Sequence, residues 1–299
     1  MKNSSRDVDQ IVKKRIACKV KCNVCVLFVV LSCVSLLDPH VGYASSILGS
    51  SENFSVLGGS TITNTGPTNI TGDLGVNPDS AITGLADIVL SAGSVNQTYA
   101  ASGQAQNAVN TASNALALMP DNSNLTGQDL GGLTLTSGVY SFASSAQLTG
   151  ILTLDAQGSN NAYWVFKIGS TLTTASNSMV QVVNLGSNLG SDDGLFWRVG
   201  SSATLGTGTS FAGNILAVTS ITLTTGATIQ NGRALAQNGA VTMDTNTINN
   251  VPGLNGGLEF NTAGKIVPVS GAPAPEPSTL LLFGVGLIGV CFLRRRIIA

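Results

Sequence analysis

Four stretches of this chain can be superimposed, and the resulting repeat constrains the fold more than any other feature. They are residues 170–175, 203–208, 221–226 and 241–246. Each has a threonine before an aliphatic residue and a second threonine three places on, with successive spacings of 33, 18 and 20 residues. A period of about 20 residues is typical of a solenoid. Side chains alternate along a strand, so we expect Leu172, Leu205, Leu223 and Met243 to stack inward. The same alternation predicts an outward row of Thr171, Thr204, Thr222 and Thr242.

The two ends of the chain differ in composition from the middle. Residues 1–44 combine a basic start with an apolar run at 24–37, which predicts a secretory signal peptide; the alternative is a retained membrane anchor. Residues 273–299 join a proline-rich stretch to the apolar run 278–293 and three arginines. An apolar helix with a basic stop sits in a membrane with its arginines on the cytoplasmic side. This run is short for a span, which favours a processing signal.

The middle, residues 45–272, has the size of a single domain. It has few charged residues, and most of them are acidic. It holds four basic and eleven acidic residues, which argues against nucleic acid as a partner. All five cysteines and the only histidine, His40, lie outside it. We therefore expect no disulfide, no thiolate or histidine metal site, and no histidine acid–base chemistry in this domain.

One segment interrupts the β pattern. Residues 97–119 are rich in alanine, and Pro120 follows them. Apolar residues recur there at three- and four-residue steps, which predicts a helix with one apolar stripe. The large aromatic residues are expected to fill the wider end of the solenoid or to face this helix; they are Trp164, Phe166, Phe196, Trp197 and Phe211.

Catalytic patterns are poorly represented. Asp192 and Asp193 precede a glycine and are most simply a solvated loop, with a calcium site as the alternative. The GxGxxG match at 284–289 lies inside the C-terminal apolar run, where small residues of a membrane helix explain it better than a dinucleotide site. We therefore predict no enzyme activity and no cofactor.

The threonine rows favour a solid ligand. The predicted outer face has almost no charge, and a second row, Thr174, Thr207, Thr225 and Thr245, is expected at the next corner. Stacked coils repeat at about 4.7–4.9 Å, which is close to short repeat distances in ice. Threonine is also common on any exposed strand, so the rows alone do not distinguish a binding surface from an ordinary strand face.

Several segments resemble the DUF3494 ice-binding proteins, namely 60–68, 71–76, 216–228 and 231–242. The resemblance covers about residues 47–250 and implies an irregular right-handed β-solenoid of triangular cross-section, mostly β, with one long α-helix alongside. It also implies that the first strands complete the stack at one end, which would explain the 33-residue spacing. Some members carry Thr-(Ala/Gly)-x-(Thr/Asn) on the ice-binding side. Residues 174–177 and 225–228 fit that pattern and add Asn177 and Thr228 to the predicted site.

The C-terminal segment is similar to a PEP-CTERM sorting signal. The matching residues are Pro275, Glu276, Pro277, Arg294, Arg295 and Arg296. The resemblance implies a Gram-negative bacterium, transient membrane insertion of the C-terminal helix and processing by an exosortase. The mature protein would then be released to, or held at, the cell exterior.

These observations lead to one hypothesis and two alternatives. The chain is predicted to be a secreted, monomeric, non-enzymatic ice-binding protein that limits ice growth and recrystallisation. The alternatives are a matrix or adhesion protein that binds polysaccharide or cell surfaces, and a β-helix enzyme acting on polysaccharide. The predicted ice-binding residues are Thr171, Thr174, Asn177, Thr204, Thr207, Thr222, Thr225, Thr228, Thr242 and Thr245.

Overall fold

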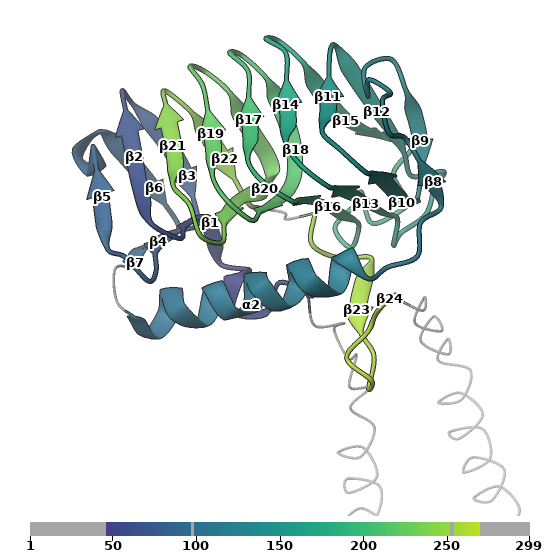
Figure 1. Cartoon of the computed structure of the whole chain (residues 1–299), viewed down its shortest axis with the longest axis horizontal. Coiled ribbons are helices and arrows are strands. Elements are labelled where there is room, and N and C mark those ends of the chain that lie inside the picture. The colour runs from purple at the N-terminus through teal and green to yellow at the C-terminus, as the bar shows by residue number, and fades with distance from the viewer. Residues whose placement is uncertain (1–45, 97–98, 252–253, 270–299) are drawn as a thin grey trace, which may run out of the picture. The chain divides into compact units, whose positions relative to one another are not determined.

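The computed structural model describes residues 46–96, 99–251 and 254–269 as a stack of parallel β-coils with one helix alongside (Figure 1). The predicted signal peptide and sorting segment lie outside these residues. Among the helices that the structure describes, none has the length and apolar character needed to cross a membrane. The prediction of a mostly β solenoid with one long helix is confirmed.

The first side of the stack is a seven-stranded parallel sheet, here called sheet B. Its strand order is β11, β14, β17, β19, β21, β2, β5. Two strands from the N-terminal part of the domain, β2 and β5, follow β21, as the resemblance implied. Figure 1 shows blue β2 beside yellow-green β21. The bounds are β11 Ala146–Leu148, β14 Leu172–Thr174, β17 Ala203–Leu205, β19 Ile221–Leu223, β21 Val241–Asp244, β2 Thr61–Thr65 and β5 Ala81–Thr83.

A 15-stranded sheet forms the other two sides because its longest strands turn the corner between them. β18 (Ser210–Ala217) and β20 (Thr228–Ala236) shift register between Ala212 and Asn214, where Gly213 has a φ of 91°. Their first halves belong to the second side with β6 Ile88–Ser91, β3 Thr68–Thr71, β22 Thr247–Asn249, β15 Met179–Val183, β12 Ile151–Asp155 and β9 Thr134–Thr136. Their second halves belong to the third side with β7 Val95–Asn96, β4 Asp73–Val76, β1 Phe54–Gly58, β16 Gly194–Val199, β13 Tyr163–Ile168, β10 Gly138–Phe142 and β8 Ser123–Asn124.

The remaining elements are short. Two 3₁₀ turns, η1 and η2, span Gly49–Ser51 and Leu85–Asp87. The antiparallel hairpin of β23 (Leu258–Phe260) and β24 (Ile266–Pro268) ends the described chain.

The long spacing in the repeat has a different cause from the one expected. Leu172 of β14 pairs directly with Ala203 of β17, so the two strands are neighbours in both sequence and stack order. The extra residues lie in the loop at 184–193, between β15 and β16. The explanation from stack order is therefore wrong for this spacing.

The core consists of inward rows that run from coil to coil. Leu205, Leu223 and Met243 form one such row, as predicted. Leu172 belongs to the neighbouring inward row, with Ala203, Ile221 and Val241.

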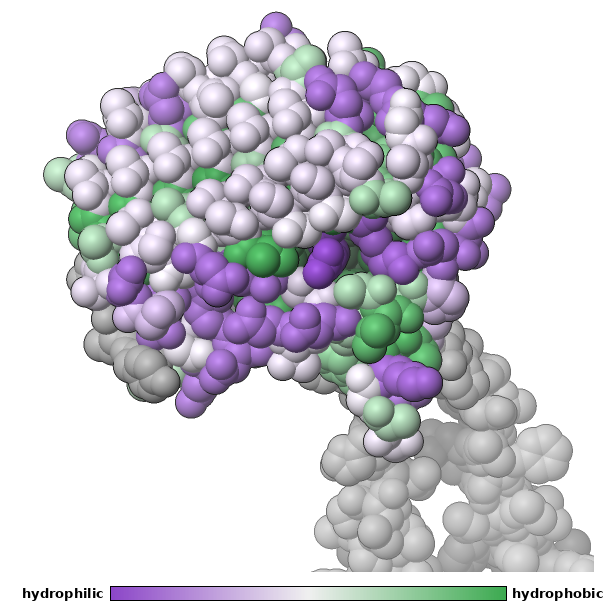
Figure 2. Space-filling view, in the orientation of Figure 1, coloured by the Kyte–Doolittle hydropathy of each residue, from purple (hydrophilic) through white to green (hydrophobic). Residues whose placement is uncertain are grey.

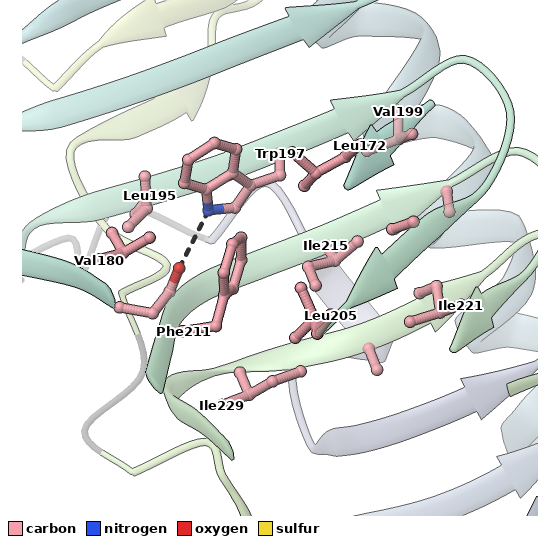
Figure 3. Close-up of a cluster of buried hydrophobic side chains, with 14 of the residues drawn as sticks. Leu172, Val180, Leu195, Trp197, Val199, Leu205, Phe211, Ile215, Ile221 and Ile229 are labelled. Atoms are coloured by element: carbon pink, nitrogen blue, oxygen red, sulfur yellow. Dashed lines mark hydrogen bonds between the residues drawn. The ribbon is translucent and has the colours of Figure 1, made fainter. Parts of the chain in front are cut away.

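Aromatic rings fill part of the core, and Figure 3 shows Trp197 and Phe211 among buried aliphatic side chains. Phe166 stacks on Trp197 at 4.0 Å between centroids, and Trp197 lies 4.9 Å from Phe211. Trp197 Nε1 donates to the Ala212 carbonyl at 3.0 Å. Trp164 is buried in the same cluster, whereas Phe196 points to the helix side. The predicted packing role of these aromatics is confirmed.

Helix α2 (Tyr99–Ala117) covers the third side. Ala105, Val109, Ala112 and Leu116 of its stripe are fully buried against Leu57, Val165, Phe196, Leu216 and Leu235. Gln106 Nε2 donates to the carbonyls of Gly58 and Ala236, both at 3.0 Å. The helix and its apolar stripe are therefore where the sequence predicts them.

Arg233 ties the start of the domain to the stack. It is 2% exposed, its Nε and Nη2 donate to the Glu52 carbonyl at 2.8 and 2.6 Å, and its Nη1 donates to Asn214 Oδ1 at 2.7 Å. Asn214 Nδ2 in turn donates to the Leu195 and Leu254 carbonyls. Burial lowers the pKa of Arg233 to about 10, although the negative charge of Glu52 acts to raise it. Arg233 therefore stays charged at neutral pH.

We expect Arg233→Met to destabilise the fold by about 3 kcal/mol, because the partly buried Glu52 carbonyl and the buried Asn214 side chain lose their donor. Denaturant unfolding measures this change. Arg198→Met is the matched control, since Arg198 also lies on the third side, is partly exposed, and has a side chain that makes no hydrogen bond or ion pair with other described residues. The control should lose less than about 1 kcal/mol; equal losses would contradict the role given to Arg233.

Candidate functional site

The outer surface of sheet B carries one unbroken row of threonines. Strand pairing puts six of them in register across six neighbouring strands, and Gln147 occupies the same position on the seventh. Figure 2 shows this side as pale parallel rows of weakly polar residues. The row, here called the central row, is Thr173, Thr204, Thr222, Thr242, Thr63 and Thr83.

The hydroxyls of the central row have no partners in the described part of the chain. Within the described residues, none of the six makes a hydrogen bond to another protein group. Their side chains are partly or fully exposed, while both sequence neighbours of Thr204, Thr222 and Thr242 are buried. The row therefore presents hydroxyls and methyls outward from a rigid base.

Charge is nearly absent from this surface. Among the strands of sheet B, the single charged residue is Asp244 at the end of β21. Its carboxylate accepts hydrogen bonds from the hydroxyls of Thr225 and Thr245, the latter at 3.0 Å. No long charged side chain of these strands stands above the threonines.

The predicted outward row is correct at three positions and wrong at one. Thr204, Thr222 and Thr242 share a row, as expected. Thr171 does not, because Thr173 is the residue that pairs with Thr204. Thr171 precedes β14 and donates to Ser145 Oγ at 2.8 Å in a flanking line of small residues.

Thr174 is a second correction. It was expected on the outer corner, but it is 3% exposed and its hydroxyl lies 2.8 Å from that of Thr209. A buried hydroxyl cannot contact an external surface, so Thr174 is not a surface residue of the site.

The other predicted residues lie around the edge of sheet B. Thr207, Thr225, Thr245 and Asn177 are exposed in the turns that follow its strands. Thr228 lies on the second side, where it pairs with Ser210 and Thr247. These five residues flank the central row and do not belong to it.

Three residues of the central row were missed. Thr63 and Thr83 come from N-terminal strands whose place in the stack does not follow sequence order. The alternation in residues 61–65 predicts a strand, but it does not show which other strand this one pairs with. Thr173 is not apparent from the repeat, because the repeat aligns Leu172 with Leu205 whereas the structure pairs Leu172 with Ala203.

Other chemistry has little support. Asp193 was expected in a solvated loop, but it is buried and its Oδ1 accepts from the Ala162 amide at 2.8 Å. Burial raises its pKa. The described residues contain no group of three or more metal-ligating side chains. A cavity of about 660 Å³ between α2 and the β23–β24 hairpin has Lys265 as the only charged residue of its lining.

Comparison with known proteins places the chain in a family. The family model described as ice-binding-like matches residues 56–249, and that of the PEP-CTERM protein-sorting motif matches 273–296. An ice-binding protein of Nostoc sp. (strain HG1) is 54% identical over 254 residues, which cover 84% of this chain and 87% of that protein. An ice-binding protein of Colwellia sp. is 33% identical over 216 residues, covering 68% and 82%.

Solved structures agree. The crystal structure of an ice-binding protein from an Antarctic biological consortium superimposes with a TM-score of 0.63 at 43% identity, covering 68% of this chain and 90% of that one. The ice-binding protein of Antarctomyces psychrotrophicus gives 0.62 at 36% identity, covering 68% and 96%. The chain therefore belongs to the ice-binding-like family, whose members are not enzymes, and carries a C-terminal PEP-CTERM sorting motif.

Proposed function

We propose that this protein adsorbs to ice through the outer surface of sheet B and so slows ice growth and recrystallisation. The observation that carries the proposal is the central row: six in-register threonines whose hydroxyls have no partner among the described residues. The relatives named as ice-binding proteins support the choice of ligand.

Stacking gives the row its spacing. Neighbouring strands lie about 4.7–4.9 Å apart, so the hydroxyls recur at an interval close to short repeats of the ice lattice. Each hydroxyl can bond to a surface water while its methyl rests between waters. A single threonine contributes little, so affinity must come from many simultaneous contacts on a surface that loses little entropy on binding.

Adsorption explains the effect on growth. Ice can advance only between bound molecules, so its front becomes curved. Curvature raises the free energy of adding water to the crystal and lowers the local freezing temperature. The same pinning hinders large crystals from growing at the expense of small ones.

The sorting motif supports a site of action outside the cell. A PEP-CTERM motif implies exosortase sorting to the cell surface or secretion. In our proposal the N-terminal 44 residues direct export, and the domain acts outside a Gram-negative cell. There it would keep liquid brine around the cell while ice forms nearby.

The direct test is an assay of residues 45–272 for thermal hysteresis and ice recrystallisation. We expect a measurable freezing-point gap and faceted crystals. Unshaped crystals at micromolar protein would overturn the proposal. Capture by matrix polysaccharide without any ice activity would favour the adhesion alternative.

Thr222→Tyr should reduce thermal hysteresis by about tenfold, because a ring in the middle of the central row holds the flat surface away from ice. The fold should stay intact, since Thr222 points outward. Gln230→Tyr is the matched control on the exposed second side and should keep full activity. If both variants retain activity, the binding surface lies elsewhere.

Thr63→Tyr tests whether the N-terminal strand extends the same surface. Thr63 pairs with Thr242, although 179 positions separate them in the sequence. We therefore expect a loss of hysteresis similar to that of Thr222→Tyr. Full activity in Thr63→Tyr would exclude the N-terminal strands from the site and limit it to β11, β14, β17, β19 and β21.

A further inference from the structure

A line of buried polar side chains runs along the corner between sheet B and the second side. It consists of Ser178, Thr174, Thr209, Asn246, Thr68 and Asn64, each at most 5% exposed, together with the partly buried Thr224. We propose that this corner ladder positions the central row, by fixing the spacing and flatness of sheet B. The inference deepens the proposed function and rests on it for the link to ice.

The ladder crosses every step between neighbouring coils. At the β11 end of sheet B, Ser178 Oγ donates to the Leu148 carbonyl at 3.0 Å. Further along, Thr224 Oγ1 donates to the Leu205 carbonyl at 2.8 Å. Asn246 Nδ2 then donates to the carbonyls of Thr224 and Ala227, both at 2.9 Å.

The N-terminal coils are joined in the same way. The Asn246 amide donates to Thr68 Oγ1 at 3.1 Å, and Asn64 Nδ2 donates to the Gly84 carbonyl at 3.3 Å. With the Thr174–Thr209 step, all six junctions of sheet B carry at least one bond made by a side chain.

Within the ladder, the junction between β14 and β17 has the most side-chain hydrogen bonds. The Gly206 amide donates to Thr174 Oγ1 at 2.9 Å, and Thr209 Oγ1 donates to the Ala175 carbonyl at 3.2 Å. The two hydroxyls lie 2.8 Å apart. One proton arrangement satisfies all three bonds: Thr174 donates to Thr209. Such a chain of hydrogen bonds is strengthened by mutual polarisation, and it lies beside Thr173 of the central row.

Sheet B needs this reinforcement because its strands are short. β11, β14, β17 and β19 have three residues each, so few backbone bonds hold each junction. Strands also twist relative to their neighbours, and flat sheets of many strands are usually held flat by stacking or by side-chain ladders. A ladder along one edge therefore determines whether six threonines present one plane.

The decisive experiment uses Thr209→Val and Thr209→Ser in the full chain. Valine keeps the shape of threonine but removes both hydroxyl bonds, whereas serine keeps them. Ser55→Ala is the matched control: Ser55 is also fully buried and donates across coils to the Thr71 carbonyl, but away from sheet B. Hydrogen–deuterium exchange of peptides covering 172–178 and 203–209 measures local rigidity, and thermal hysteresis measures the effect on ice.

We expect Thr209→Val to speed exchange in both peptides by about tenfold and to reduce hysteresis about fivefold, as the loss of a buried network allows. Thr209→Ser should restore both, and Ser55→Ala should change neither. Unchanged exchange in Thr209→Val would overturn the ladder as a positioning device. Faster exchange with full hysteresis would overturn its link to ice binding. A wild-type chain without hysteresis would refute the proposed function alone, since exchange still tests the ladder.

Discussion

The structure depends on the in-register parallel stacking of short coils. Each coil places an aliphatic residue inward and its neighbour outward, so one alternation creates the core and the outer surface together. Leu205, Leu223 and Met243 pack as a row for the same reason that Thr204, Thr222 and Thr242 align. A slip of one residue would put threonine in the core and leucine outside. The apolar rows thus supply the free energy that holds the threonines in line.

The sequence predicted the central row where coils follow each other without insertion. The prediction was wrong at β14, because an alternating hydrophobic pattern assigns every threonine to the outer face. Aligning Leu172 with Leu205 is the better apolar match, but the fold pairs Leu172 with Ala203. Thr174 is then buried, and its hydroxyl is satisfied by Thr209 and Gly206. A buried, hydrogen-bonded threonine leaves no trace in an apolar pattern. Thr173 therefore became visible as a site residue only with the strand register.

Pairings between distant segments were also beyond the reach of periodicity. Thr63 joins Thr242 because β2 extends the exposed edge of β21, and β1 completes the third side of the same coil by pairing with β20 and β4. Arg233 holds that arrangement by bonding Glu52. The segment 231–233 gives no hint that its arginine is buried. The family resemblance supplied the stack order, which composition and spacing did not.

The three sides of the solenoid differ in what they leave open to a ligand. The third side is covered by α2, whose small residues let it lie close. The second side is open, but its outward rows include the exposed apolar residues Ile151, Met179 and Val89. Within the part of the chain that the structure describes, sheet B alone combines an uncovered surface, one side-chain type across six strands and the polar ladder along its edge. A solid ligand offers no pocket, so rigidity and repetition must replace enclosure as the source of affinity.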